Sequence, residues 1–258
     1  MTPKDVDKPL PLLQHLADLR RCFLNSLAGI FVGMVVAWFL RRWLLVELLR
    51  PLRPYLPPGE GLTVLSLTEA FIFYVKLSFF GGIFLASPWV LWQVWRFVAP
   101  GLYAHEKRAL LGLIAFSTVC FLAGGYFGYR VLMPLTCRFL IDVSQDFHLL
   151  ITTTSYLSFF LHLILGVALT FEMPVFTLLL ARLGIVSARS LWKFWRVAVV
   201  ASFVVAAVVT PSGDMITQTV LAVPLVGLYF VSVLVAWLFG KRPQAKVAAR
   251  EREIESAP

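Results

Sequence analysis

Two acidic residues, Asp18 and Glu106, have the surroundings that a cation-binding site needs. Each lies in a short polar stretch, 12–23 and 97–108, that also contains basic and aromatic residues. A carboxylate accepts two parallel hydrogen bonds from the planar guanidinium group of arginine, a geometry that a lysine ammonium does not offer. Two such carboxylates near one another would therefore suit a ligand that carries paired guanidinium groups.

Each of these acids also has a simpler structural interpretation. Leucines recur at helical spacing in 12–23 and predict a helix whose apolar face lies in the membrane interface. On that helix Asp18 can pair with Arg21, three residues later, for a few tenths of a kcal/mol. Glu106 can occupy the first turn of the helix that follows Pro100-Gly101, where the macrodipole favours a carboxylate. The residues alone leave these interpretations open.

A third acid, Glu172, lies within the apolar stretch 155–181. An acid inside the bilayer is costly, so a function is the default hypothesis for it. Pro174 leaves the carbonyl of Thr170 without its helical partner and predicts a kink beside the acid. Glu172 could be a neutral carboxylic acid in one interhelical hydrogen bond, or the proton-coupling acid of a secondary transporter.

Sequence signatures of enzymes are absent. His105-Glu106 begins an HExxH zinc motif, but Ala109 stands where the second histidine is required. The chain has no GxSxG, P-loop or dinucleotide fingerprint, and its three cysteines include no CxxC. An intramembrane hydrolase would need a nucleophile and a base, and no such pair is visible. We therefore expect no enzymatic activity, no catalytic residues, no metal site and no cofactor.

The elements that must position these residues are transmembrane helices. Hydrophobic residues make up 59% of the 258 residues, and several runs approach the roughly 20 apolar residues that cross about 30 Å of hydrocarbon. Helices satisfy their own backbone groups in lipid, whereas open strands do not. The sequence predicts an all-α membrane protein, a bundle of six transmembrane helices in one membrane domain, 1–239. The charged remainder, 240–258, is expected to be disordered. The predicted spans are 22–40, 70–97, 109–138, 155–181, 194–210 and 214–239.

Basic residues set the predicted orientation. Most of the 23 lysines and arginines lie in the two tails and in the loops on the same side as the tails. The opposite side has only Arg41, Arg42, Arg50, Arg53 and Arg138. By the positive-inside rule both termini are cytoplasmic. The net charge of +9 is then a topological signal and an attraction to anionic lipid, and we expect no nucleic-acid partner. A prokaryotic plasma membrane is the simplest location.

The last predicted hairpin is unusually short. The apolar run between Arg196 and Thr210 is 13 residues, or about 20 Å of helix against a core of about 30 Å. Either the bilayer is thinner there or the hairpin lines a water-filled concavity. Asp214 is predicted to cap the sixth helix at its N-terminus, with Gln218 one turn further on.

Taken in order, several stretches of the chain resemble the TatC family, the multispanning receptor of the twin-arginine protein translocase. The resemblance covers about residues 10–240. It is carried by 15–21, 69–71 with Lys76, 87–95, 97–107, 156–159, 171–175, 210–214 and 222–224.

The resemblance implies a bowl-shaped bundle that binds the twin-arginine signal peptides of folded precursor proteins at the cytoplasmic surface. It also implies single-span TatA- and TatB-type partners, other copies of the chain in the complex, and export driven by the protonmotive force. It implies that Glu172 lies on the concave face, that Asp214 and Gln218 form a partner region, and that Pro51 is a functional proline of the first external loop. The implied signal-peptide residues are Asp18, Arg20, Phe97, Leu102, Tyr103, Glu106 and Lys107.

At one of these positions the chain departs from the family. Family members usually carry glutamate where this chain has Asp18. The charge is the same, but the side chain is one methylene shorter. A contact of Asp18 with a signal-peptide arginine through a water molecule would accommodate the difference.

Overall fold

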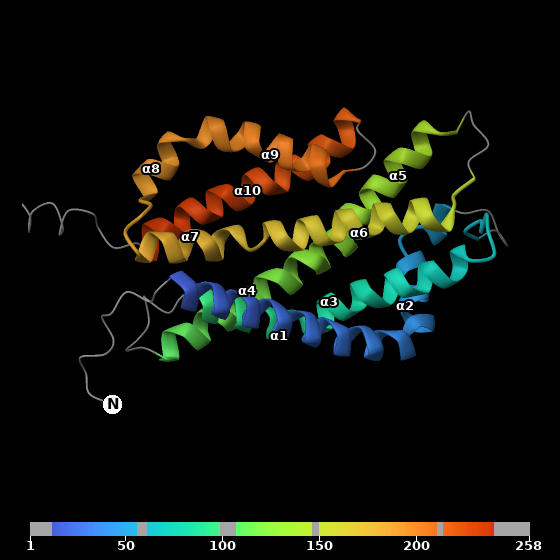
Figure 1. The fold of residues 1–258 in the computed structure, drawn as a ribbon. Coiled ribbons are helices and arrows are strands. Elements are labelled where there is room, and N and C mark those ends of the chain that lie inside the picture. Colours follow the sequence, from blue (N-terminus) through green and yellow to red (C-terminus); the bar gives the residue numbers. More distant parts are fainter. Residues whose placement is uncertain (1–11, 56–60, 99–106, 146–149, 211–213, 240–258) are drawn as a thin grey trace, which may run out of the picture. The chain divides into compact units, whose positions relative to one another are not determined.

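The structure is a computed structural model that describes residues 12–55, 61–98, 107–145, 150–210 and 214–239. Side chains are described throughout these ranges except at 12–14 and 107–110. The described residues form helices and connecting loops, with one isolated β-bridge (Figure 1). The helices are α1 (Leu12–Phe39), α2 (Arg41–Leu49), the 3-10 turn η2 (Arg53–Tyr55), α3 (Glu69–Val98), α4 (Lys107–Phe127), the π-helical turn η3 (Gly128–Leu132), α5 (Met133–Val143), α6 (Thr153–Thr170), α7 (Met173–Arg182), α8 (Ala188–Lys193), α9 (Trp195–Val209) and α10 (Met215–Phe239).

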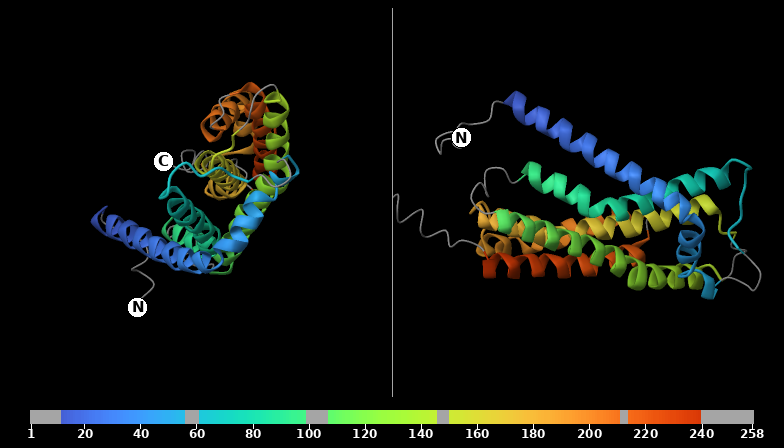
Figure 2. Two further views of the ribbon diagram at one scale, coloured as in Figure 1. Left: turned by 90° about the vertical axis from the view of Figure 1, so that its right-hand side faces the viewer. Right: turned by 90° about the horizontal axis from the view of Figure 1, so that it is seen from below.

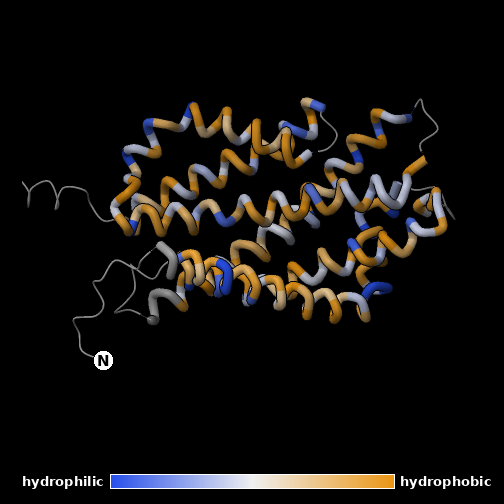
Figure 3. The backbone as a smooth tube through the Cα atoms, in the orientation of Figure 1, coloured by the Kyte–Doolittle hydropathy of each residue, from blue (hydrophilic) through white to orange (hydrophobic). Residues whose placement is uncertain are grey.

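Five helical stretches in the described part are long and apolar enough to cross a membrane, and α9 is a sixth, shorter apolar helix. The five are His15–Phe39, Glu69–Val98, Leu111–Val143, Thr153–Arg182 and Met215–Phe239. Hydrophobic residues predominate along each of them (Figure 3). This confirms the prediction of an all-α membrane protein. The stretch Thr153–Arg182 is not one straight helix, because α6 ends at Thr170 and α7 begins at Met173.

The chain divides into two compact units, Met1–Ala168 and Leu169–Pro258. In the first unit, α1 runs along α3, and α2 turns away from the end of α1 (Figure 2). The two long helices meet backbone to backbone at Gly33 and Gly82. A Cβ atom on Gly33 would lie 2.6 Å from the carbonyl oxygen of Gly82, and one on Gly82 would lie 2.5 Å from the Met34 nitrogen. Small residues permit such close approach of membrane helices.

Buried polar contacts join the other helices of the first unit. The indole nitrogen of Trp95 on α3 donates to the hydroxyl of Ser117 on α4 at 2.8 Å, and both residues are fully buried. The hydroxyl of Tyr156 on α6 donates to the carbonyl of Leu48 on α2 at 2.8 Å. A buried donor without a partner costs on the order of 1–3 kcal/mol, so these contacts fix which helices are neighbours.

Two loops of the first unit are joined by backbone pairing and by Glu69. The backbone nitrogen of Thr63 donates to Ile151 at 2.9 Å, and that of Thr153 donates to Thr63 at 3.0 Å. Glu69, the first residue of α3, accepts hydrogen bonds from the Leu65 backbone nitrogen at 2.7 Å and the Thr154 hydroxyl at 2.7 Å. The Thr153 hydroxyl also donates to it. One carboxylate therefore connects the loop before α3 with the start of α6.

In the second unit, α10 packs on α7 and α9. The α7 helix ends at a left-handed Gly184, with φ of 72°, a conformation that glycine adopts without a steric penalty. The short α8 helix begins at Ser187, whose hydroxyl accepts from the Ser190 nitrogen at 3.1 Å. The hydroxyl of Tyr229 on α10 donates to the carbonyl of Leu191 on α8.

Candidate functional site

A polar cavity of about 240 Å³ lies where the beginning of α1 meets the end of α3. Residues at helical spacing on α1 form one wall, and the last turns of α3 form the other. Both helices belong to the first unit, and their packing along the Gly33–Gly82 contact brings these ends together. The lining residues are His15, Asp18, Arg21, Cys22, Asn25, Gln93, Arg96 and Phe97.

Asp18 is solvent-exposed in this cavity. The pairing of Asp18 with Arg21 that its spacing allows is not formed, since no ion pair within 4 Å joins Asp18 to any cation in the described ranges. An i,i+3 pair on an exposed helix gains only a few tenths of a kcal/mol, too little to hold two side chains in one geometry. Among the described residues, no cation is paired with this carboxylate.

Aromatic and amide side chains complete the cavity. The rings of His15 and Phe97 are stacked, with their centroids 4.5 Å apart and their planes at 18°. Gln93 is buried, so its amide faces the cavity from within the packed part of α3. The indole of Trp89 donates to the carbonyl of Asn25 at 3.0 Å and holds α3 against α1 one turn further along. The cavity therefore combines one acid, two arginines, an amide and a pair of stacked aromatic rings.

The structure brings together only some of the residues implied for signal-peptide binding. Asp18 and Phe97 line the cavity, while Arg20 is exposed on α1 and does not. Lys107 begins α4, with its side chain outside the described part. Leu102, Tyr103 and Glu106 lie outside the described residues, as do the predicted tail at 240–258 and the turn at 211–213.

Six lining residues had no predicted role in binding: His15, Arg21, Cys22, Asn25, Gln93 and Arg96. On α1 the signal was present, because Cys22 and Asn25 follow Asp18 at intervals of four and seven residues and share its face. Gln93 and Arg96 lie on another helix more than 70 positions away, and no periodicity in the sequence connects them with Asp18. Their position depends on the crossing of α1 and α3.

Glu172 lies at the break between α6 and α7, in the second unit, where it is the residue before the first turn of α7. Its side chain is buried, with 4% of its surface exposed. Pro174 follows in that first turn, where its missing N–H costs no helical hydrogen bond. The kink predicted beside this proline is present as a complete interruption of the helix.

Asp214 and Gln218 are placed at the start of α10. The Asp214 carboxylate accepts from the Thr217 backbone nitrogen at 2.7 Å, which confirms the predicted N-terminal cap. Gln218 lies one turn further and donates its amide to the carbonyl of Phe203 on α9 at 2.8 Å. Both residues therefore stabilise the short hairpin of α9 and α10. The α9 helix has 15 residues, or about 22 Å, which is less than the roughly 30 Å core.

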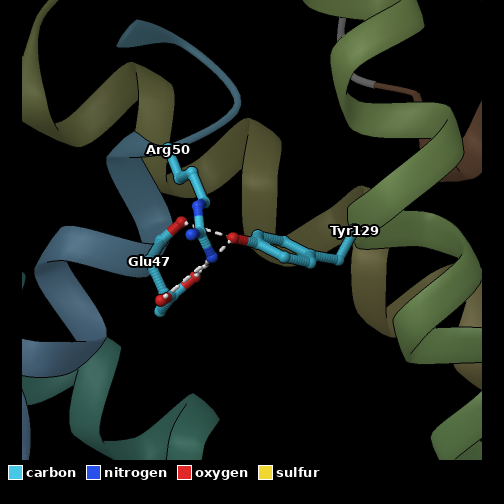
Figure 4. A network of polar contacts seen from close by, with 3 residues as sticks. All are labelled: Glu47, Arg50 and Tyr129. Atoms are coloured by element: carbon cyan, nitrogen blue, oxygen red, sulfur yellow. Dashed lines mark hydrogen bonds and ion pairs between the residues drawn. The ribbon is translucent and has the colours of Figure 1, made fainter.

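Pro51 is buried at the opposite end of the first unit, in the turn between α2 and η2. Beside it a second polar cluster joins α2 to η3 (Figure 4). The Tyr129 hydroxyl donates to the Glu47 carboxylate at 2.7 Å, and Arg50 forms an ion pair with the same carboxylate at 3.1 Å. These contacts hold the pKa of Glu47 below its ordinary value of 4.5, with the hydrogen bond from Tyr129 the largest cause.

Within the described part, no group of three or more histidine, cysteine, aspartate or glutamate side chains is placed to hold a metal ion. The polar features are a cavity with an unpaired acid, a buried acid at a helix break, and two clusters in which acids are bound by neighbouring donors. The cavity that contains Asp18 also has Arg21 and Arg96 in its wall, so its described charged groups are one acid and two arginines.

Comparisons with known proteins agree with this architecture. A family model described as Sec-independent protein translocase protein (TatC) matches residues 14–224. A protein of that name from Koribacter versatilis is 38% identical over 97% of this chain and 92% of its own length. One from Campylobacter jejuni is 36% identical over 91% of this chain and 97% of its own length.

A solved structure titled as the twin arginine translocase receptor TatC superposes with a TM-score of 0.77. It is 32% identical in sequence, and the match covers 87% of this chain and 98% of the solved one. The apolar helices, the cavity at the start of α1 and the short hairpin are thus found in a chain that matches this family over residues 14–224. The chain belongs to the TatC family of Sec-independent, twin-arginine protein translocase subunits.

Proposed function

We propose that this chain is the signal-peptide receptor of a twin-arginine translocase. It binds the twin-arginine signal peptides of folded precursor proteins and, with TatA- and TatB-type single-span partners and further copies of itself, supports their export across the prokaryotic plasma membrane, driven by the protonmotive force. Membership of the family supports the proposal, and a similar solved chain is itself titled a translocase receptor.

The observation that carries the proposal is the exposed Asp18 in the cavity between α1 and α3. Its carboxylate has no ion pair among the described residues, and the stacked His15 and Phe97 rings lie in the same cavity. A guanidinium group can pair with the carboxylate through two hydrogen bonds and stack on an aromatic face, whereas an ammonium group offers neither a fork nor a plane. The geometry therefore favours arginine over lysine.

A second carboxylate is needed for the second arginine. Arg21 and Arg96 border the same cavity, so Asp18 alone does not give it a negative charge. Glu106 immediately precedes Lys107, the first residue of α4, and we assign the second acid to it. Charge-assisted contacts of this kind contribute about 1.5–3 kcal/mol each, equivalent to about ten- to hundredfold in affinity.

The proposed orientation places the beginning of α1 at the cytoplasmic surface. The two tails and the loops on their side carry most of the lysines and arginines, which favours that side as the inner one. A signal peptide would then reach Asp18 from the compartment in which precursors fold. Accessibility of single cysteines to a membrane-impermeant reagent, applied from one side, tests the orientation.

The binding proposal is tested with two peptides that differ only in carrying paired arginines or paired lysines. Affinity is measured by fluorescence anisotropy for the reconstituted wild type, Glu106→Gln and a control, Asp142→Asn. Asp142 is an exposed acid on α5, where it pairs with Arg138. We expect Glu106→Gln to lower the affinity for the arginine peptide about tenfold and to leave the affinity for the lysine peptide almost unchanged. If Glu106→Gln binds both peptides as tightly as the wild type does, or if Asp142→Asn has the same effect as Glu106→Gln, the assignment of the recognition site is wrong.

A secondary transporter that uses Glu172 for proton coupling would give a different result. Such a protein transports its substrate alone in liposomes, whereas a receptor subunit exports no precursor without its partners. Reconstitution of the chain alone and together with TatA- and TatB-type proteins separates the two functions. Export by the chain alone would contradict the receptor proposal.

A further inference from the structure

A second, larger cavity of about 520 Å³ lies within the first unit, at the end opposite Asp18. Its volume is within the roughly 300–1,000 Å³ of ligand-binding pockets. Most of the wall is apolar and comes from α1, α2, α3, α6 and the end of α4, with Leu77, Phe84 and Ile164 among the lining residues. Leu40 and Leu85 line it too and are 44% and 54% exposed, so the cavity opens onto the surface of the unit.

The polar rim of this cavity has an excess of positive charge. Glu47, Arg50 and Arg130 are its charged lining residues. The Glu47 carboxylate is already bound by Arg50 at 3.1 Å and by the Tyr129 hydroxyl at 2.7 Å (Figure 4). Arg130 is exposed and makes no ion pair within 4 Å to any acid in the described ranges. The rim thus carries one uncompensated positive charge.

The helix around Arg130 departs from regular α geometry. Tyr129 and Arg130 belong to η3, a single π-helical turn between α4 and α5. Tyr126, one turn earlier, lines the same cavity. π-Helical turns inside longer helices frequently occur at functional sites. Here the turn presents a tyrosine that donates to Glu47 and, next to it, an arginine without an ion pair among the described residues.

The apolar stretch Leu111–Val143, which contains Arg130, has 33 residues, or about 50 Å of helix, and so is longer than the hydrocarbon core is thick. Arg130 follows Lys107, the start of α4, by 23 residues, which is about 34 Å along a helix axis. Because the hydrocarbon core is about 30 Å thick, a start of α4 in one headgroup layer places Arg130 in the other. Trp43 and Tyr126 are exposed beside the cavity, and these residue types are enriched at that layer.

We propose that this cavity binds one anionic phospholipid, with its phosphate at Arg130 and Arg50 and an acyl chain against the apolar wall. The single excess charge complements a phosphodiester, and guanidinium groups bind phosphate through paired hydrogen bonds. A free phosphate would leave the apolar wall without a ligand, and an apolar peptide segment would leave Arg130 without a counterion. A phospholipid satisfies both parts of the site.

Lipid retention measured by native mass spectrometry tests this proposal. The protein is purified from vesicles that contain equal amounts of phosphatidylglycerol and phosphatidylcholine. We expect the wild type to retain phosphatidylglycerol in at least fivefold excess, and Arg130→Gln to retain the two lipids about equally. The control is Arg138→Gln, which removes an exposed arginine of α5 that pairs with Asp142 and does not line the cavity. It should behave like the wild type.

Two further measurements test the acyl-chain part of the site. Leu40→Trp narrows the cavity without altering the arginines, and its exposed position makes loss of the fold unexpected. We expect it to retain several-fold less phosphatidylglycerol. Glycerol phosphate should not displace the lipid. The proposal is overturned if the wild type shows no headgroup preference, if Arg138→Gln loses as much lipid as Arg130→Gln, or if an uncharged apolar peptide or glycerol phosphate displaces the lipid fully.

Discussion

The two ends of the first unit both contain acidic side chains, but these acids are used differently. At the beginning of α1, Asp18 is exposed and has no ion pair among the described residues. At the other end, Glu47 is bound by Tyr129 and Arg50. Glu69 there accepts hydrogen bonds from Leu65, Thr153 and Thr154.

The difference separates acids that hold the protein together from an acid that can hold a ligand. A carboxylate has about four acceptor positions, and Glu69 uses most of them for its own chain. A guanidinium ligand would have to displace those donors before it could bind there. At Asp18 no ion pair of the described residues has to be broken, which supports the proposal that recognition occurs at this end of the unit.

The largest expected effect comes from reversal of the charge at position 18. Asp18→Lys removes one charge-assisted contact and adds repulsion, so the affinity for a twin-arginine peptide should fall about a hundredfold. The melting temperature should stay unchanged, because the side chain is exposed. Calorimetric titration and thermal unfolding measure the two properties. A fall in melting temperature that accounts for the loss of affinity would assign Asp18 a structural role instead.

A converse result is expected at the other end. Glu69→Ala removes the acceptor for the Leu65 nitrogen and for two threonine hydroxyls, so the loop before α3 and the start of α6 lose their common contact. The melting temperature should fall by several degrees, while the peptide affinity stays within twofold of the wild type. Glu69→Gln keeps one acceptor oxygen, so its melting temperature should fall by less than that of Glu69→Ala. An unchanged melting temperature of Glu69→Ala would contradict the structural role assigned to Glu69.

The smallest effect is expected at Glu47 and should depend on pH. Since the folded pKa of Glu47 lies below its ordinary value of 4.5, its contribution to stability is complete above about pH 4.5 and is lost as the pH falls through the folded pKa. Tyr129→Phe removes the hydroxyl that is the largest cause of this lowering. The melting temperature of the variant should be slightly lower than that of the wild type at pH 7. This gap in melting temperature should shrink as the pH falls. A gap that stays constant down to pH 3 would exclude Glu47 as its origin.

Local rules predicted much of the backbone. Apolar length predicted the six apolar helical stretches, Pro174 predicted the interruption beside Glu172, and the position of Asp214 predicted its cap. The interruption and the cap depend on residues within one turn of one another, and each apolar stretch depends on one continuous run of the sequence. The pair between Asp18 and Arg21 that their spacing allows is not formed, because the small gain of such a pair does not decide side-chain positions on an exposed helix.

Contacts between distant parts of the chain were not predictable in this way. Glu47 and Tyr129 are 82 positions apart, and neither lies in a motif that indicates the other. The same holds for Gln93 and Arg96, which reach the Asp18 cavity only because α1 crosses α3. The proposed contribution of Glu106 stays a prediction, since this residue lies outside the described part.

The backbone contact between Gly33 and Gly82 has a consequence for genetic screens. Any side chain at either position would push α1 away from α3, and Asp18 lies about 22 Å further along α1 from Gly33. A small tilt at the crossing would therefore displace the acid from Gln93 and Phe97. Export-defective alleles should be recovered at these two glycines, although both residues are buried and lie outside the Asp18 cavity.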